Sequence, residues 1–429
     1  MTSIHDRPVV TELRLSAFKS HRGASFGFGP ITLLSGGSGT GKSSVLEALA
    51  ALGRLACGDG LDEVFGSVVR GGPAACVPQD AQPDAQGRRG FRIGCTVTGP
   101  VGPVRLDVAV QAEPTLRIVG ERLTGAGETL LTTALRDPER RTVQAAWHTA
   151  GLVAVTRAPL PDDRLATALL PLRVAGRTDG QRLVLAAAEQ MVVALRGVFP
   201  IAPRPELMRA PVPVGEGRLR ASCDNLSAVL ARTEGECGTR HAMLVNAVRA
   251  VCSPPVEGIT ALRAAAGGEV VPGAVNVVNS ACVSGTSGAS GTSGVSGTSG
   301  PVDSVIAAVD RGPLGLVPVD RLGDGELRFL ALALVLLTGP GVLDVDTSTE
   351  LLPASQVLTV LGDGLDHGLD RRQLGELLRL AGPAAERGHI RLLGTVQDAG
   401  FAEGLGGVSV TALGVPRPRR REDAVDQSG

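Results

Sequence analysis

The sequence predicts an α/β fold, and three features of the chain carry this prediction. A glycine-rich loop joins a short apolar run, 31–34, to a segment with helical apolar spacing, 44–50. Residues 65–147 break into short alternating segments punctuated by proline and glycine, the pattern of an antiparallel β layer. Residues 180–265 then carry apolar side chains at three- and four-residue spacing, which is typical of helices. With 429 residues, the chain is long enough for two or three domains or for one large domain with insertions.

The glycine-rich loop fits a phosphate-binding pattern. Its sequence matches G-x-x-x-x-G-K-[ST], the P-loop or Walker A motif, at every fixed position. The glycines let backbone N–H groups turn inward around phosphates without Cβ clashes, and the first turn of the following helix adds unsatisfied donors. In such a loop Lys42 reaches the β- and γ-phosphates, and Ser43 is a ligand of Mg²⁺. The predicted nucleotide-binding residues are therefore Gly36, Gly37, Ser38, Gly39, Thr40, Gly41, Lys42 and Ser43.

Lysine usage gives independent support for this motif. Of the 42 lysine and arginine residues, only Lys19 and Lys42 are lysines, so a lysine retained inside the loop indicates a chemical requirement. The alternative is a glycine-rich turn that matches by chance. It explains neither the retained lysine nor the strand and helix patterns on either side of the loop.

The composition narrows the classes of function. With eight Phe, one Trp and no Tyr, the chain lacks the side chains of a base-stacking surface for single-stranded nucleic acid. A net charge of −1 gives no overall attraction to nucleic acid or to an acidic membrane. The seven cysteines are scattered without a C-x-x-C pair, which predicts free thiols and argues against a zinc site. No signal peptide and no run of 18 apolar residues is found, so we expect a soluble cytoplasmic protein without a membrane partner.

Residues 10–49 carry a resemblance to a known family. This stretch, with ELRLSAFKSHRGASFGFGPITLLSGGSGTGKSSVLEAL, resembles the N-terminal half of the ATPase heads of RecF, SMC and related ABC-type AAA-family proteins. The resemblance implies a P-loop NTPase of the ABC/RecF-like type, with an antiparallel β layer, that takes ATP and Mg²⁺. It also implies a homodimer in which ATP clamps two heads together, often on DNA. Gln79 is a candidate for the metal-contacting glutamine of the family, with an ordinary loop glutamine as the alternative.

A second glycine-containing loop, within residues 320–334, runs straight into a strongly apolar helix. It resembles the ABC signature motif, in which the helix start of one subunit points at the γ-phosphate held by the other. A plain core helix capped by Asp324 is the alternative. The position of the loop, after a phosphate loop and before a Walker B-like segment, favours the signature. The resemblance then implies nucleotide contacts from Gly323, Asp324, Gly325 and Glu326.

The Walker B-like segment is expected at residues 341–353, as an apolar strand that ends in the aspartate ordering Mg²⁺ through water. Asp344 and Asp346 are both candidates. Asp346 is preferred, because Leu351 and Pro353 then fall where the family has a leucine and a proline. The implied metal ligands are thus Ser43 and Asp346, and the implied catalytic residues are Lys42, Asp346 and Glu350. Residues 356–387 are expected to be helical, with a break at 362–364.

Three positions depart from the family pattern. Thr347 stands in place of the catalytic glutamate, Gly323 in place of the signature serine, and Val396 in place of the switch histidine. A threonine hydroxyl is too weak a base to polarise water near neutral pH. We therefore expect an ATP-binding protein with slow hydrolysis and a role in DNA repair, maintenance or defence. The alternative is a catalytically degenerate nucleotide-binding module whose dimerisation regulates a protein partner.

The expected domain order follows from these segments. It comprises an N-lobe (9–175), a helical arm (176–265), a flexible Ser/Gly/Thr linker (266–304), a C-lobe (305–415) and a disordered tail (416–429). The arm must be short, because no sustained heptads of a long coiled coil occur.

Overall fold

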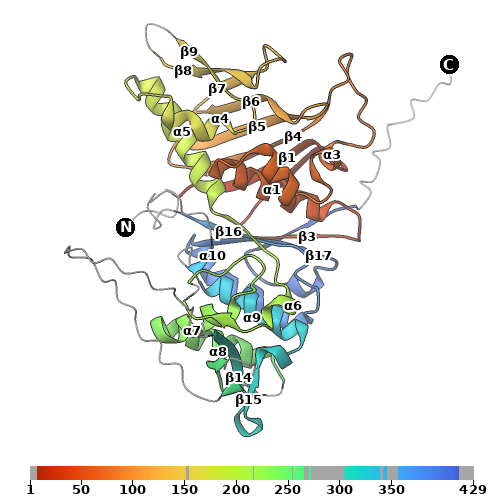
Figure 1. Ribbon diagram of the computed structural model, residues 1–429, viewed down its shortest axis with the longest axis vertical. Helices are drawn as coiled ribbons and strands as arrows, with labels where there is room; N and C mark the ends of the chain where they lie inside the picture. Colours follow the sequence, from red (N-terminus) through yellow and green to blue (C-terminus); the bar gives the residue numbers. More distant parts are fainter. Residues whose placement is uncertain are drawn as a thin grey trace, which may run out of the picture.

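The structure is a computed structural model of the chain, and it forms two stacked lobes (Figure 1). An antiparallel sheet with α1 to α5 makes the upper lobe in this view. A parallel sheet with α6 to α10 and a small third sheet makes the lower lobe. The structure describes residues 7–150, 154–215, 217–253, 255–264, 270–271, 304–338, 342–344 and 356–414.

The upper lobe contains an eight-stranded antiparallel sheet. Its side chains alternate between buried and open faces, as along β8, which is why the sequence shows alternating segments here. The predicted antiparallel layer is confirmed. In order across the sheet, the strands are β2 (His21–Gly27), β1 (Val9–Phe18), β4 (Arg89–Gly99), β5 (Gly102–Glu113), β6 (Arg117–Gly125), β7 (Glu128–Ala134), β8 (Thr142–His148) and β9 (Val155–Pro161).

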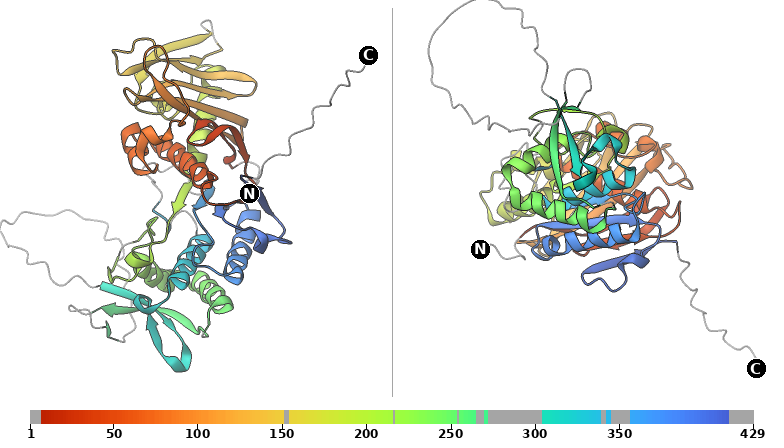
Figure 2. Two further views of the ribbon diagram at one scale, coloured as in Figure 1. Left: turned by 90° about the vertical axis from the view of Figure 1, so that its right-hand side faces the viewer. Right: turned by 90° about the horizontal axis from the view of Figure 1, so that it is seen from below.

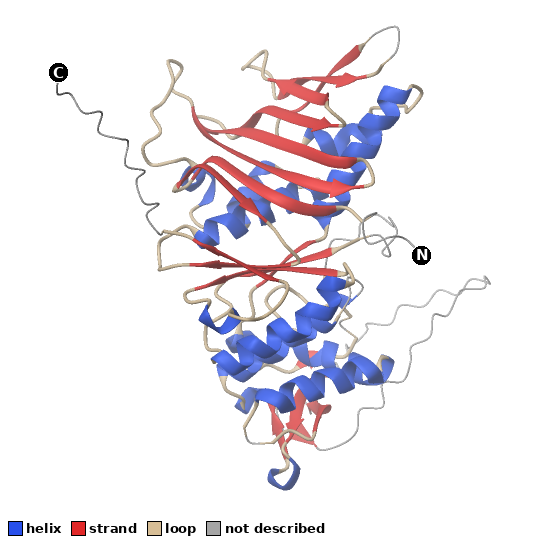
Figure 3. Cartoon of the chain, turned by 180° about the vertical axis from the view of Figure 1, so that it is seen from behind, coloured by secondary structure: helices blue, strands red, loops and turns tan. Residues whose placement is uncertain are grey.

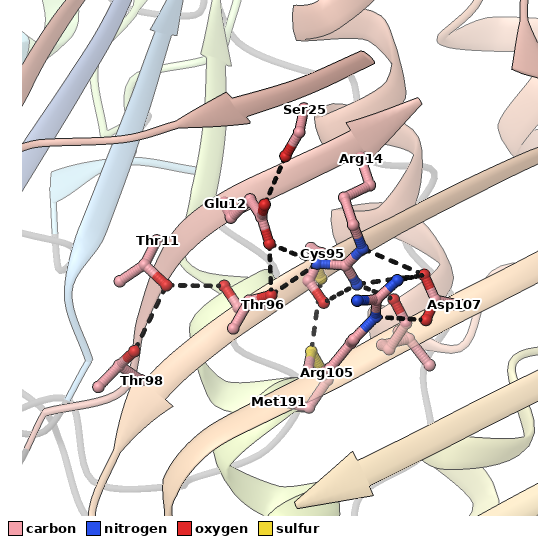
Figure 4. A network of polar contacts seen from close by, with 11 residues as sticks. Thr11, Glu12, Arg14, Ser25, Cys95, Thr96, Thr98, Arg105, Asp107 and Met191 are labelled. Carbon is pink, nitrogen blue, oxygen red and sulfur yellow. Dashed lines mark hydrogen bonds and ion pairs between the residues drawn. The ribbon is translucent and has the colours of Figure 1, made fainter. Parts of the chain in front are cut away.

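A polar network crosses three strands on the open face of this sheet (Figure 4). Arg14 of β1 donates to Asp107 Oδ1 of β5 from Nε and Nη2, each at 3.2 Å. Its Nη1 also donates to Glu12 Oε2 at 2.7 Å and to Thr96 Oγ1 at 2.6 Å. The intervening residue on β4 is Gly94, whose added Cβ would lie 2.5 Å from Asp107 Oδ1. Gly94 thus leaves the space that lets this buried arginine bridge β1 and β5.

The lower lobe is built on a five-stranded parallel sheet. All five residues of β3 and of β16 are buried, as expected for a parallel sheet covered on both faces. Helix α1 packs on one face and α10 on the other, and Figure 3 shows helices on both sides of the sheet. In order, the strands are β10 (Val198–Ile201), β16 (Leu358–Gly362), β17 (Ile390–Val396), β3 (Ile31–Ser35) and β18 (Val408–Ala412).

A small third sheet closes the far end of the lower lobe, as the left view of Figure 2 shows. Its strands are β11 (Val212–Pro213), β14 (Ser304–Asp310), β12 (Gly258–Ala264) and β13 (Val270–Val271), with β15 (Leu316–Pro318) paired to β14. The helices of the fold are α1 (Lys42–Cys57), α2 (Leu61–Ser67), α3 (Gly72–Cys76), α4 (Ala166–Leu169), α5 (Asp179–Arg196), α6 (Pro205–Met208), α7 (Leu226–Glu236), α8 (Gly238–Val251), α9 (Asp324–Leu337) and α10 (Arg371–Glu386).

The segment predicted as a short helical arm, 176–265, packs against both lobes. Helix α5 packs along the antiparallel sheet and α1, and the residues that follow it form β10, an edge strand of the parallel sheet. Helices α7 and α8 pack on β14 and α9. The physical reason is that α5 buries an apolar stripe, including Val184, Ala188, Met191 and Leu195, against the upper lobe.

The reading of 356–387 as helical is wrong at its start. Residues Leu358–Gly362 form β16, because a short, fully apolar run is compatible with a buried strand as well as with a helix. Only from Arg371 does the segment become helical, as α10.

Several predicted segments lie outside the described residues. They are most of the linker at 266–304, all of the tail at 416–429, and Asp346, Thr347, Glu350, Leu351 and Pro353. Within the part of the chain that is described, no helix is long and apolar enough to cross a membrane.

Candidate nucleotide site

The phosphate loop lies between the end of β3 and the start of α1, as the sequence predicts. Gly36 and Gly41 have φ angles of 146° and 90°, in the region that favours glycine. An added Cβ at Gly36 would lie 2.5 Å from the carbonyl oxygen of Leu413, and one at Gly41 would lie 2.5 Å from His21 Nε2. Both the backbone conformation and the close packing therefore require glycine at these motif positions.

Positive charge gathers at the loop. Lys42 Nζ donates to the carbonyl oxygens of Gly36 at 2.6 Å and of Gly37 at 2.8 Å, so the lysine folds over the loop. No side chain caps the start of α1 and its first turn, which is fully described, holds no acidic residue. The first N–H groups of α1 and the Lys42 ammonium together form a cradle suited to an anion.

A carboxylate from the lower lobe meets the first turn of α1. Ser43 Oγ donates to Asp363 Oδ1 at 2.9 Å, and Thr395 Oγ1 of β17 donates to the same oxygen at 2.8 Å. Asp363 immediately follows β16, which is separated from β3 by β17 alone. An apolar strand thus ends in an aspartate at the carboxyl edge of the sheet, beside the serine of the loop. This arrangement was expected from the sequence within residues 341–353.

The residue after Asp363 is Gly364, and its backbone conformation would strain any side chain. Its φ angle is 64°, and an added Cβ would lie 2.6 Å from His367 Nδ1. The Gly364 N–H donates to Thr395 Oγ1 at 2.7 Å, which ties this turn to β17. The residue directly after the aspartate thus offers no carboxylate to polarise water, and a side chain there would cost roughly 1–2 kcal/mol.

The predicted Walker B-like strand does not join the parallel sheet where it is described. Leu343 makes one isolated parallel bridge to Leu219, and the Asp344 N–H donates to the Leu219 carbonyl at 2.9 Å. The preferred Asp346, with Thr347 and Glu350, lies outside the described residues. The match of Leu351 and Pro353 to the family favoured this register, whereas the apolar run that ends at Asp363 was assigned to a helix.

A chain of ion pairs connects Asp363 to the upper lobe. Arg70, between α2 and α3, contacts Asp363 Oδ2 at 2.6 Å and Glu47 Oε1 of α1 at 3.0 Å. Lys19, at the end of β1, contacts the other oxygen of Glu47 at 2.5 Å. No functional role was predicted for these residues from the sequence. The scarcity of lysine in the sequence could have pointed to Lys19, because both lysines of the chain lie at this site.

The signature-like segment starts α9 and bonds within the lower lobe. The Gly323 N–H donates to Glu326 Oε2 at 3.3 Å, and the other oxygen of Glu326 pairs with Arg311 at 2.5 Å. Asp324 pairs with Arg209 at 2.6 Å. These bonds hold the helix start in place, and the described contacts of one chain do not bring it to the phosphate loop.

The two remaining predicted positions have different surroundings. Val396 is 1% exposed and belongs to the core of the lower lobe, so it faces no phosphate; the exposed Gln397 is the next residue. Gln79 is exposed and lines a cavity of about 540 Å³ together with Lys19, Ser20 and Arg22. The cavity adjoins the phosphate loop, because a Cβ at Gly41 would lie 2.9 Å from Ser20 Oγ.

A known family matches the segment of the chain around the loop. Residues 12–53 match the family described as an AAA domain, which covers β1 to most of α1. The resemblance to AAA-family ATPase heads is confirmed there, and with the sheet order above it confirms the α/β P-loop fold class. No curated protein matches the chain.

Several solved structures are similar to this chain over most of its length at low sequence identity. The SMC head bound to the C-winged helix domain of ScpA has 11% identity and a TM-score of 0.45, covering 91% of this chain and 90% of that chain. The SMC head domain from Thermotoga maritima has 10% identity and a TM-score of 0.40, covering 94% of each chain. A structure of the recombination mediator protein RecF with ATPrS has 11% identity and a TM-score of 0.41, covering 95% of this chain and 97% of that chain.

Proposed function

Starting from an AAA-type segment on a P-loop α/β fold, we propose that this protein binds Mg·ATP and hydrolyses it slowly. The observation that carries the proposal is the contact between Ser43 and Asp363, which joins the loop serine to an aspartate at the end of a neighbouring strand. A hydroxyl and a carboxylate are oxygen ligands, which Mg²⁺ prefers, and Mg²⁺ is commonly held by one or two such groups plus phosphate oxygens.

Each part of the nucleotide has a proposed place. Lys42 and the start of α1 hold the phosphates, and Ser43 with Asp363 holds Mg²⁺, which supplies charge neutralisation on the phosphate oxygens when bound. The cavity beside Gly41, lined by Lys19, Ser20 and Arg22, has the position and the volume for the nucleoside end. Among the described residues no group of three or more His, Cys, Asp or Glu could hold a metal ion, so the phosphates complete this Mg²⁺ site.

Slow hydrolysis follows from the residue after Asp363. With Asp363 as the metal-ordering aspartate, Gly364 takes the place of the family's glutamate and offers no base. Loss of a general base lowers the rate by roughly 10²- to 10⁴-fold. Arg70, paired with Asp363, supplies a cation beside the metal position but no base.

The partners of an ATP-bound dimer are proposed from the family resemblance and from one charged surface of this chain. ATP would draw two heads together through the start of α9, and DNA is the first proposed partner of the resulting dimer. Arg92 of β4 and Arg122 of β6 are exposed on the open face of the antiparallel sheet, where they offer cations to phosphates. Regulation of a protein partner by a degenerate module remains the second proposal, and it predicts dimerisation on ATP with negligible turnover.

The proposal is tested by comparing Asp363 with Asp344, one of the two aspartates that the sequence favoured. Mg²⁺-dependent ATP affinity is measured by titration calorimetry for Asp363→Asn and for Asp344→Asn as the matched control. We expect Asp363→Asn to weaken binding about 10- to 100-fold, because a residue that orders the metal is lost. Asp344→Asn should bind as the wild type does. Equal affinities of all three proteins would refute the assignment, and thermal unfolding confirms that each variant is folded.

A second experiment separates the two partners. Sedimentation with and without ATP reports dimerisation, and phosphate release with and without duplex DNA reports coupling to DNA. Stimulation by DNA that declines with salt supports the DNA-acting ATPase. Dimerisation on ATP without any stimulation supports the regulatory module.

A further inference from the structure

A second cavity, of about 630 Å³, opens in the lower lobe between α8, the end of α9, α10 and the start of β17. It lies at the amino ends of the parallel strands, because Ile390 begins β17 and lines it. The phosphate loop and Asp363 lie at the opposite, carboxyl ends. The cavity is therefore separate from the nucleotide site.

The wall of this cavity is positively charged. Arg7, Arg379 and Arg387 line it together with His389, and no aspartate or glutamate is among the described residues that line it. Arg379 pairs with Glu376, which lies outside the lining, but Arg387 makes no side-chain bond to any described residue. Among the described residues that line it, the cavity thus carries an excess of cationic groups.

His389, which lines the cavity, is held by Arg7. Arg7 Nη1 lies 2.9 Å from His389 Nδ1 and 3.2 Å from the Gly388 carbonyl oxygen. A guanidinium only donates, so Nδ1 accepts and the imidazole is neutral with its proton on Nε2. Desolvation, then the charges of Arg7 and Arg387, lower the pKa of His389, in agreement with this neutral form.

The floor of the cavity is apolar. Leu336 and Leu337 at the end of α9, Leu380 and Pro383 of α10, and Ile390 supply it. Small-molecule sites in proteins are hollows of roughly 300–1,000 Å³ with mostly apolar walls and a few convergent polar groups. A duplex needs a row of cations along an open surface instead, so this hollow fits a compact ligand better than nucleic acid.

We propose that this cavity is a binding site for a small organic anion, with an acidic group facing Arg7 and Arg387 and an apolar body on the leucine-rich floor. The arginines supply charge-assisted hydrogen bonds, and the floor supplies burial of apolar area. The site is distinct from the ATP site and does not depend on the proposed ATPase function.

The test uses 8-anilinonaphthalene-1-sulfonate, which carries one sulfonate on an aromatic body. Its fluorescence is titrated with the full chain in the presence of excess Mg·ATP, which occupies the other site. We expect saturable binding with one site per chain. Arg387→Gln and Arg7→Gln should each weaken it about fivefold or more, as loss of a charge-assisted hydrogen bond does. Ala384→Trp, which fills the lined volume, should abolish it.

Arg372→Gln is the matched control, because Arg372 is an exposed arginine on α10 that does not line the cavity. It should bind the probe with unchanged affinity. Non-saturable fluorescence in the wild type, or equal affinities of Arg387→Gln, Arg7→Gln and the control, would overturn the proposal. Thermal unfolding of every variant shows that a loss of binding is not a loss of fold.

Discussion

The two halves of the nucleotide site differ in how the chain builds them. The phosphate loop is one contiguous stretch, in which eight consecutive residues set the backbone angles, the lysine and the serine. The carboxylate half is assembled from Asp363, Thr395 and Arg70, which come from separate segments and meet only in the folded lobe. Local backbone conformation determines the geometry of a contiguous site, whereas the order of strands in the sheet determines the geometry of an assembled one.

The largest expected effect concerns the contiguous half. Lys42→Ala removes the ammonium that folds over the loop, and we expect ATP affinity to fall about 10- to 100-fold, or about 1.5–3 kcal/mol, as for a hydrogen bond to a charged group. Titration calorimetry measures it. Arg54→Gln, at the other end of α1, is the control and should bind ATP normally. Unchanged affinity in Lys42→Ala would mean that the loop does not hold phosphate.

Next in size is a change in the sheet that supports the loop. Gly94→Ala places a methyl group about 2.5 Å from both Asp107 Oδ1 and the Leu106 carbonyl, and we expect the free energy of unfolding to fall by about 1–3 kcal/mol. Gly120→Ala, whose Cβ would meet its nearest neighbour at 3.7 Å, is the control and should cost less. Urea unfolding compares them. Equal costs would show that the Arg14 network does not need the space at Gly94.

A smaller effect tests the assembled half. Gly364→Ala forces a side chain into a left-handed conformation, so we expect a loss of about 1–2 kcal/mol in unfolding free energy. Gly375→Ala, inside α10 with nothing within 4 Å of its Cβ, should instead stabilise the protein by about 0.5–1 kcal/mol. Opposite signs in the same unfolding assay support the tight turn after Asp363. A stabilising Gly364→Ala would contradict it.

The smallest expected effect is a pH dependence of the free energy of unfolding, and it arises from Glu12 on the antiparallel sheet. The hydrogen bond from Ser25 and those from Thr96 and Arg14 lower the pKa of Glu12 below its usual value of 4.5. A depressed carboxyl pKa gives stability that is present above the unfolded pKa and is lost as the pH falls through the folded pKa. Because Glu12 is partly exposed, Glu12→Gln should cost well under about 1 kcal/mol at pH 7.

Unfolding curves of Glu12→Gln and the wild type should converge as the pH falls through the lowered folded-state pKa of Glu12, below which both side chains are neutral. Glu128→Gln, an exposed position on the same sheet, is the control and should show no such convergence. A difference between Glu12→Gln and the wild type that persists at low pH would assign the effect to packing.

Sequence reasoning succeeded where neighbours in the chain are neighbours in space. The loop from Gly36 to Ser43 and the alternating strands β4, β5 and β8 are local patterns, and the structure has them where they were expected. Strand β9 was missed because prolines at 159 and 161 argue against a strand, yet an edge strand tolerates them.

The assembled parts escaped prediction for a physical reason. The run before Asp363 is apolar throughout, so its periodicity does not distinguish a buried strand from a helix. Only the pairing of this run with β10 and β17 makes it a strand. Strand β10 lies about 160 residues before it in the sequence and β17 about 30 residues after it. The contacts of Glu47 with Lys19 and Arg70 depend in the same way on packing between elements.

Because lysine is scarce, an amine-specific reagent can label the candidate site selectively. The chain has two lysines, and both side chains lie at the candidate nucleotide site, Lys42 on the loop and Lys19 against Glu47 of α1. An acylating reagent specific for amines therefore finds side-chain targets only where ATP is proposed to bind. Protection of these two amines by Mg·ATP, read by mass spectrometry of the peptides, would report occupancy of the site without any mutation.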